Sequence, residues 1–136
     1  MPYHFDYEPG PGILNIKLSG LITGDDIREA TSKAIACQKE TGVTRFLVDL
    51  GRWEVGASIA DIRELPAEQY SQEGLSRESR IAVIIPDATS SRYAANYYEN
   101  ECRKFGWNAQ LFPDQASAHN WLLNAENGDA RDTGNA

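Results

Sequence analysis

Hydrophobic and polar positions alternate in two short segments near the N-terminus. Aromatic side chains alternate with polar ones in residues 3–8 (YHFDYE), and aliphatic ones do so in residues 13–18 (ILNIKL). A period of two is typical of strands with one buried face. Residues 9–12 (PGPG) form a Pro- and Gly-rich turn between them. The pattern therefore predicts a β-hairpin at the start of the chain.

Three further apolar runs, each followed by a helical pattern, follow this hairpin. They lie at residues 45–50 (RFLVDL), 81–85 (IAVII) and 109–113 (AQLFP). Strands that alternate with helical segments predict βαβ units and a largely parallel sheet. The run at 81–85 is apolar at every position, which indicates a central strand. The predicted order is ββαβαβαβα, a fold of the α/β class.

Capping residues mark where the predicted helices begin and end. Thr23 or Asp25 can cap the first helix and Gly42 ends it, while Ser58 is the expected N-cap of the second. Pro66 should make that second helix break or restart, with residues 67–72 as a second short turn, because proline lacks the backbone N–H that a helix interior uses. The remaining helices are predicted at 90–105 and after Asp114, and residues 20–24 and 51–57 are predicted loops.

Length and charge narrow the class of protein. The 136 residues suit one domain, predicted at 1–123, and residues 124–136 lack large apolar side chains and are predicted to form a flexible tail. The net charge of −7 argues against nucleic-acid binding, which needs clustered Lys and Arg. No apolar stretch approaches the roughly 18 residues of a membrane helix, and residues 1–10 lack the basic and apolar regions of a signal peptide. We expect a cytoplasmic protein that does not insert into membranes.

No catalytic or metal-binding motif is visible. His4 and His119 have no Cys, Asp or Glu at metal-ligand spacing, and the phosphate-binding and nucleophile-elbow glycine motifs are absent. Cys37 and Cys102 fall in separate helical stretches and are best explained as small buried hydrophobes. The sequence therefore predicts no catalytic residue, no metal site and no cofactor.

Polar and aromatic residues gather instead where the predicted parallel strands end. The loops that leave such strands share one edge of the sheet with the helix N-termini, and ligands tend to bind there. Trp53 lies between two glycines in a predicted loop, and is either an exposed interface residue or a local plug over the helix ends. The candidate ligand- or partner-binding residues of this rim are Arg52, Trp53, Glu54, Ser58, Asp87, Ser90, Arg92 and Tyr93.

Several phrases of the sequence resemble a known superfamily. They are RFLVDLG at 45–51, RIAVIIPD at 80–87, and a closing stretch with Tyr98-Glu99, Arg103, Phe105-Gly106, residues 111–114 and Trp121-Leu122. Over residues 3–123 the chain resembles the SpoIIAA-like superfamily, which unites anti-sigma-factor antagonist (STAS) domains with the Sec14-like lipid-binding fold. The resemblance implies a five-stranded, mostly parallel mixed sheet with helices mainly on one face and an antiparallel first strand.

The resemblance also implies a place for a phosphorylated serine. In anti-sigma-factor antagonists that residue lies in an Asp-Ser-Ser-Gly-Leu stretch at a helix start. Here the corresponding residues are 55–60 (VGASIA), in which Ser58 alone remains. Because a serine at a helix N-terminus is explained by capping, we predict that Ser58 is a cap and not a switch.

Two functions of different classes follow. The first is a non-enzymatic binding or regulatory module that engages a protein partner or a small apolar or anionic ligand at the rim. The alternative is a small hydrolase-type enzyme that uses the carboxylates and serines of the same rim. The absence of catalytic motifs, and the binding role that the resemblance implies, favour the first. The aromatic first strand, expected at an open sheet edge, further predicts a homodimer.

Overall fold

The computed structural model describes residues 3–124, and these form a five-stranded mixed sheet in the order β1-β2-β3-β4-β5. β1 is antiparallel to β2, and every other neighbouring pair is parallel. This is the predicted fold class. The strands are β1 (Tyr3–Glu8), β2 (Ile13–Thr23), β3 (Arg45–Gly56), β4 (Arg80–Ile84) and β5 (Asn108–Phe112).

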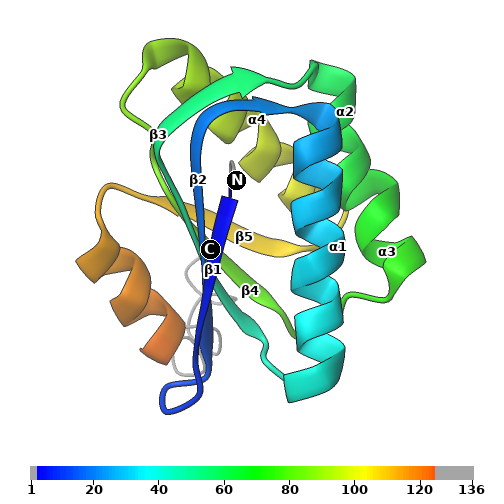
Figure 1. Ribbon diagram of the computed structural model, residues 1–136, viewed down its shortest axis with the longest axis vertical. Coiled ribbons are helices and arrows are strands. Elements are labelled where there is room, and N and C mark those ends of the chain that lie inside the picture. The colour runs from blue at the N-terminus through cyan, green and yellow to red at the C-terminus, as the bar shows by residue number, and fades with distance from the viewer. Residues whose placement is uncertain (1–2, 125–136) are drawn as a thin grey trace.

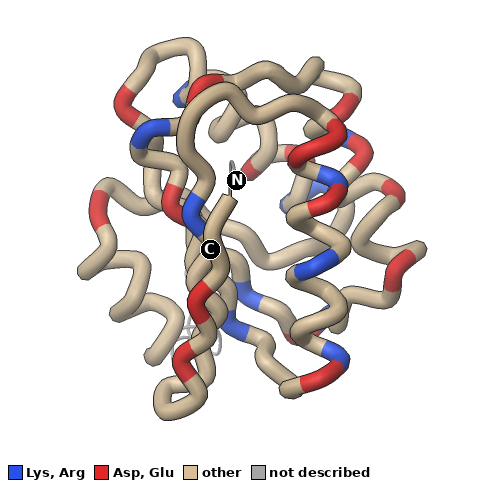
Figure 2. Tube along the Cα trace, viewed as in Figure 1, with Lys and Arg blue, Asp and Glu red and all other residues tan. Residues whose placement is uncertain are grey.

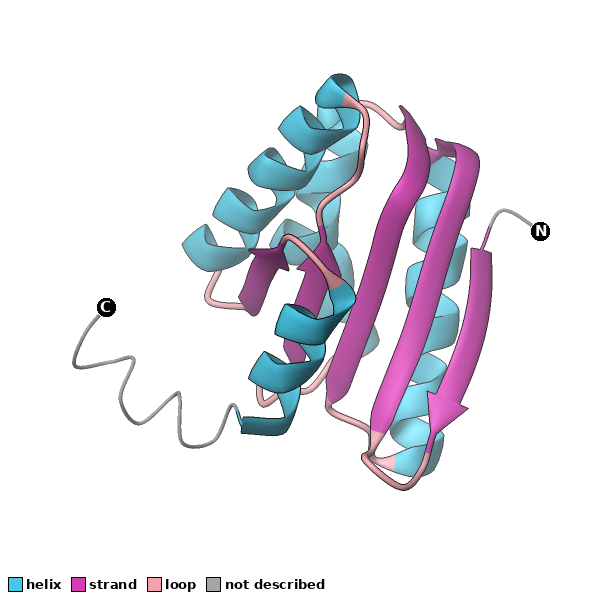
Figure 3. Ribbon diagram, turned by 90° about the vertical axis from the view of Figure 1, so that its left-hand side faces the viewer, coloured by secondary structure: helices cyan, strands magenta, loops and turns pink. Residues whose placement is uncertain are grey.

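The helices lie in two layers of unequal size. Parallel strands in sequential order, joined by right-handed crossovers, place every crossover helix on the same face of the sheet. The last helix, at 115–124, lies on the opposite face, as Figures 1 and 3 show. The crossover segments are α1 (Gly24–Thr41), α2 (Ile59–Glu64) continuing through η1 (Leu65–Gln69) and α3 (Tyr70–Glu73), and α4 (Thr89–Lys104).

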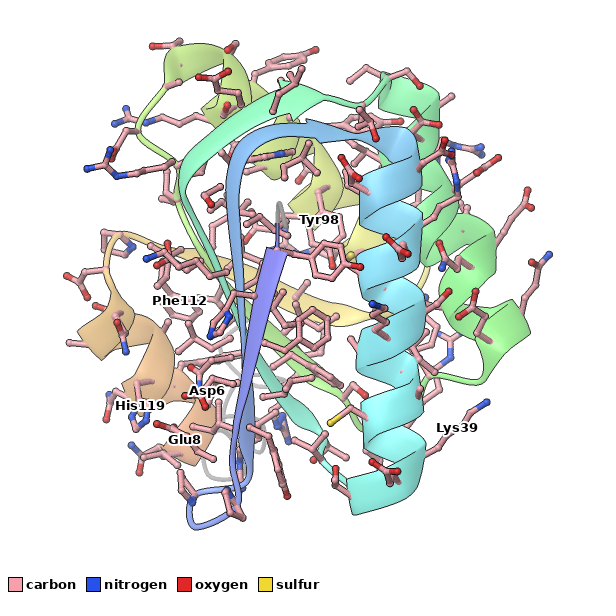
Figure 4. The ribbon with its side chains drawn as sticks, viewed as in Figure 1. Asp6, Glu8, Lys39, Tyr98, Phe112 and His119 are labelled. Carbon is pink, nitrogen blue, oxygen red and sulfur yellow. The ribbon has the colours of Figure 1, made fainter. Side chains whose placement is uncertain are left out.

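Two apolar cores follow from these layers. The larger core fills the space between the sheet and the crossover helices and includes Phe46, Leu50 and Ile81. The smaller one packs the last helix on the other face, where the Phe112 and Trp121 ring centroids are 5.4 Å apart. Figure 4 marks Phe112 in the smaller core. Both faces of β4 are therefore buried, which confirms it as a central strand.

The predicted helix caps are present. The Thr23 hydroxyl accepts a hydrogen bond from the Asp26 N–H at 3.1 Å, so that Thr23 and not Asp25 caps α1. Gly42 ends α1 in the left-handed region, at φ 81°. Ser58 caps α2, and the Asp61 carboxylate accepts the Ser58 N–H in return, forming a capping box.

The second helix changes at the position of Pro66, where a break or restart was predicted: α2 ends at Glu64, but the chain stays helical. It widens into the π-helical turn η1, in which the Tyr70 N–H donates to the Leu65 carbonyl, and continues into α3. Pro66 lies in the first turn of η1, where its missing N–H costs least. The wider turn therefore accommodates the proline, and such turns often occur at functional sites.

The Gln38 side chain links the C-terminal end of α1 to the segment before β4 by hydrogen bonds. Its Nε2 donates to the Val43 carbonyl at 2.9 Å and to the Ser79 hydroxyl at 2.8 Å, while its Oε1 accepts the Ser76 N–H at 2.8 Å. The Gln38 side chain is buried, so these hydrogen bonds satisfy its amide group away from solvent.

The C-terminal end of the predicted tail, residues 125–136, lies outside the described residues. Its flexibility and the domain boundary at 123 therefore stay predictions. Within residues 3–124, no helix has the length and apolar character that crossing a bilayer requires.

Candidate functional site

Residues 51–56 of the loop predicted at 51–57 belong to strand β3, and this changes where the side chains of the candidate site lie. β3 runs on to Gly56, and β2 extends beside it to Thr23, with Gly20 opposite Trp53 and Thr23 opposite Gly56. Both extensions were predicted as loops because glycines interrupt each pattern. They form strands because each supplies the other's backbone hydrogen-bond partners, which no single segment of sequence reveals.

A β-bulge then decides where Trp53 lies. Between Lys17 and Ser19 of β2 the pairing advances from Asp49 to Arg52 of β3, so that β3 carries one extra residue. Side chains alternate between faces along a strand, and the extra residue reverses that alternation. Phe46, Val48 and Leu50 face the larger core before the bulge, and Trp53 and Val55 face it afterwards. Without the bulge, Trp53 would face the opposite side of the sheet.

Trp53 is consequently buried, with 5% of its surface exposed. Of the two predicted alternatives, an exposed interface residue and an inward plug, the structure has the inward one. The Ser91 hydroxyl, also buried, donates to the Trp53 carbonyl at 2.8 Å and ties this part of β3 to α4. The indole N–H has no hydrogen-bond partner in the described part of the chain. A buried donor left unpaired is uncommon and calls for an explanation.

An apolar cavity lies beside the Trp53 side chain. A space of about 120 Å³ lies between the sheet and the crossover helices, and Trp53 forms part of its wall. The sheet contributes aliphatic and aromatic side chains, and α1, α2, η1 and α4 contribute the opposite wall. Representative lining residues are Ile16, Leu50, Ala34, Leu65, Ala95 and Tyr98. None of the lining residues in the described chain carries a charge.

The cavity wall contains a few polar atoms. Besides the Trp53 indole, they belong to Thr31 and to Tyr70 and Tyr98, whose hydroxyl oxygens are 2.5 Å apart. Figure 4 marks Tyr98 in the interior. Burial raises the pKa of both phenols well above the ordinary value, so both stay neutral at physiological pH. The cavity is therefore apolar with a small number of neutral hydrogen-bonding groups.

The nearby Cys102 is not an activated nucleophile. It is fully buried in α4, and burial raises the pKa of its thiol to about 12. Only the thiolate is a strong nucleophile, and here almost none forms at neutral pH. Both cysteines are free thiols; Cys102 is buried as predicted, but Cys37 is only half-buried, so the prediction of burial is wrong for Cys37.

Polar contacts hold α1 to the second crossover segment. The Arg28 Nη1 atom is 3.0 Å from the Asp61 carboxylate, and the Gln69 amide donates to the Arg28 carbonyl at 3.0 Å. The Ser32 hydroxyl donates to Glu73 at 2.9 Å. Figure 2 shows the acidic residues along these helices. The Ser58 backbone N–H, followed by Arg28, lowers the pKa of Asp61. The two helical segments that form one wall of the cavity are thus joined by polar groups.

The other predicted rim residues are exposed and flank the carboxyl ends of the strands. They are Arg52, Glu54, Ser58, Asp87, Ser90, Arg92 and Tyr93. A backbone hydrogen bond links β3 to the segment after β4, since the Asp87 N–H donates to the Gly51 carbonyl at 3.2 Å. The Arg92 side chain of α4 donates from Nε to the Pro86 carbonyl at 3.0 Å. Tyr93 is 69% exposed. Only Trp53 of the predicted set belongs to the cavity.

Sequence reasoning missed the rest of the cavity wall. Its residues are ordinary core positions of strands and helices, and their periodicity predicts burial but not incomplete packing. The closely spaced tyrosines of α4, Tyr93, Tyr97 and Tyr98, are the one signal, because at least one of them must face the core. Tyr98 faces the core and also lines the cavity.

The two histidines lie on different elements. His4 lies exposed on β1, and His119 lies half-buried on the last helix, where Figure 4 marks it. Among residues 3–124 no three His, Cys, Asp or Glu side chains come together in a way that could hold a metal ion.

Comparison with known proteins addresses the fold. A model of the SpoIIAA-like family matches residues 13–123. An uncharacterised protein with a SpoIIAA-like fold from Shewanella loihica PV-4 superposes with a TM-score of 0.56 at 18% identity, over 88% of this chain and 93% of that one. The anti-sigma factor antagonist SpoIIAA in its unphosphorylated form gives 0.49 at 14% identity, over 85% and 91%. A search of the curated proteins found no match.

Proposed function

We propose that this chain, which belongs to the SpoIIAA-like family, is a non-enzymatic binding module that holds a small apolar ligand between its sheet and its crossover helices. The proposal moves the ligand from the loop rim, where the sequence places it, to the cavity beneath that rim. The observation that carries it is the apolar cavity of about 120 Å³ behind Trp53.

The energetic cost of an empty cavity supports the proposal. Protein interiors are packed as densely as organic crystals, and few voids exceed a water molecule. Apolar side chains that border unfilled space lose the dispersion contacts that a packed core would give them. An engineered apolar cavity of about 150 Å³ stays dry and binds benzene. A one-ring molecule would regain much of the lost packing energy here.

The alternative of a small hydrolase has less support. A serine nucleophile needs a neighbouring base that is free to take its proton. The Ser58 hydroxyl accepts from the Asp61 N–H, and the Asp61 carboxylate is engaged by the Ser58 N–H and by Arg28. Both groups are thus occupied in capping and in joining helices.

The exposed rim remains a second proposal, as the contact site of a protein partner. Leu21, Ile59 and Tyr93 are large apolar side chains that are 61%, 45% and 69% exposed, and they lie where strands end and helices begin. If a partner binds there, Tyr93→Ala should weaken that complex without changing ligand binding in the cavity.

Homodimerisation is a further part of the proposal. β1 lies at the end of the strand order, with one edge that pairs with no other strand in residues 3–124. Proteins usually cover or pair such an edge. Light scattering at high concentration should give the mass of a dimer, and a monomeric mass would rule the dimer out.

Binding of a hydrocarbon tests the cavity. We expect α-methylstyrene to raise the melting temperature in proportion to the logarithm of its concentration, because a ligand that binds only the folded state stabilises it. Ala34→Leu places a larger side chain on the cavity wall and should abolish the rise, whereas Ala36→Leu, exposed on the same helix, should retain it. An unchanged melting temperature for the unsubstituted protein would refute the proposed function.

A further inference from the structure

Two arginines lie side by side where the parallel strands begin. Arg45 and Arg80 are the first residues of β3 and β4, and the register places them directly opposite each other. Leu47 and Ala82, two residues further along each strand, belong to the smaller core, so both arginines project from the face that carries the last helix. Like charges in directly opposite positions of a sheet are destabilising. A negatively charged group beside this pair would therefore stabilise the fold.

The Arg45 guanidinium reaches the end of the last helix. Its Nε donates to the Leu122 carbonyl at 3.1 Å, and its Nη1 donates to the Pro11 carbonyl at 3.0 Å. Both acceptors are neutral, and among residues 3–124 no Asp or Glu forms an ion pair with Arg45. The side chain is half-buried, so solvent and salt screen its charge less than that of an exposed arginine. Arg45 thus places a positive charge beside the last turn of this helix, with no carboxylate partner in the described part of the chain.

Acidic residues follow this helix in the sequence. Residues 125–136 (AENGDARDTGNA) contain three acids, Glu126, Asp129 and Asp132, and one arginine. Glu126 is four residues beyond Leu122, and even a fully extended chain spans only about 14 Å over that length. A short tether raises the effective concentration of such groups to about the millimolar range, so that ion pairs too weak to form between separate molecules can form within one.

We propose that the acidic residues that follow Asn124 bind the Arg45–Arg80 pair, so that the C-terminal segment of this chain is the partner of that surface. The contact would help to hold the last helix on the sheet, because Arg45 already links that helix to the hairpin turn. The prediction of a flexible tail rests on the lack of large apolar side chains in residues 124–136, and ion pairs do not require such side chains. The contact is independent of the apolar cavity and of its ligand.

Titration of the three acidic side chains tests the contact. Carbon-detected NMR of the full chain follows each carboxyl carbon against pH, and a synthetic peptide of residues 125–136 gives the values without the arginine pair. We expect at least one carboxyl group to have a lower pKa in the protein than in the peptide, with an acid dissociation constant about threefold larger or more. The net charge of −7 acts in the opposite direction, because surrounding negative charge raises a carboxyl pKa. About 0.5 M salt should reduce the difference, since it screens exposed charges.

Substitutions on one strand separate a local contact from the overall charge. Arg45→Gln removes a positive charge at the start of β3, and Arg52→Gln removes one at an exposed position seven residues further along the same strand. At about 3.3 Å per residue the two positions are about 23 Å apart. We expect Arg45→Gln, and separately Arg80→Gln, to return the carboxyl pKa toward its value in the peptide, whereas Arg52→Gln should leave it unchanged.

Three results would overturn the proposal. Equal pKa values in the protein and in the peptide would show that the acids do not bind the protein. Equal effects of Arg45→Gln and Arg52→Gln would show that only the net charge of the chain matters. A pKa difference that grows with protein concentration would place the acids on another copy of the chain. The comparison with the peptide uses the unsubstituted protein, so it decides the matter even if Arg45→Gln fails to fold. Binding of α-methylstyrene reports on the cavity separately, so either proposal can fail without the other.

Discussion

Filling the cavity from α1 should stabilise the protein. Ala34 is buried, lines the cavity and lies in the middle of α1. Ala34→Leu adds three carbon atoms to a space of about 120 Å³. A core without such a space would be overpacked by this change and would lose about 1–3 kcal/mol. The sign of the stability change therefore reports whether the space exists.

The expected gain follows from burial and side-chain entropy. Each added carbon that is removed from water contributes about 0.8 kcal/mol, or about 2.4 kcal/mol for three. Ordering a leucine side chain costs about 0.5–1 kcal/mol. We expect a net increase of about 1–2 kcal/mol in the free energy of unfolding.

Urea unfolding of two variants measures this gain. Ala36→Leu makes the same substitution at an exposed position of the same helix, so the difference in helix propensity between alanine and leucine cancels. Both variants should unfold with similar m values, because the surface exposed on unfolding hardly changes. If Ala34→Leu is less stable than Ala36→Leu by more than about 1 kcal/mol, the core is fully packed and the reasoning about the cavity is refuted.

Three further predictions concern the polar contacts that hold the helices. Ser58→Ala should lower the free energy of unfolding by about 1 kcal/mol in urea titrations, the usual loss of an N-cap, whereas exposed Ser90→Ala should change it by less than half as much; equal losses would count against the cap. The folded-state pKa of Asp61 is lowered, chiefly by the Ser58 N–H, so its contribution is present above the unfolded pKa of about 3.9 and is lost as the pH falls through the lower folded value. The stability difference between the unsubstituted protein and Asp61→Asn should thus be constant above about pH 5 and shrink in acid, and a difference that grew on acidification would contradict this. Gln38→Ala removes three buried hydrogen bonds and should cost about 2–4 kcal/mol, against a small effect for exposed Gln72→Ala; thermal unfolding that is the same for both variants would show that the Gln38 bonds are not formed.

Local patterns in the sequence determined the elements and their caps. The alternation in residues 3–8 and 13–18, the apolar run at 81–85, and the capping roles of Ser58 and Gly42 all depend on residues close together in the chain. Short-range sterics and hydrogen bonding decide such features, so a single sequence carries them. The order of these strands and helices then predicts the mostly parallel sheet, and with the quoted phrases it points to the SpoIIAA-like family.

Tertiary structure alone decided the two features on which the proposed function depends. The ends of β2 and β3 become strands only because they pair with each other, and the bulge opposite Lys17 to Ser19 turns Trp53 inward. The cavity arises because the side chains of the sheet and the crossover helices do not fill the space between them. Neither pairing nor imperfect packing leaves a periodic signal, since both depend on residues far apart in the chain. The sequence could identify Trp53 as unusual, but only its long-range neighbours determine which way it faces and leave its N–H unpaired.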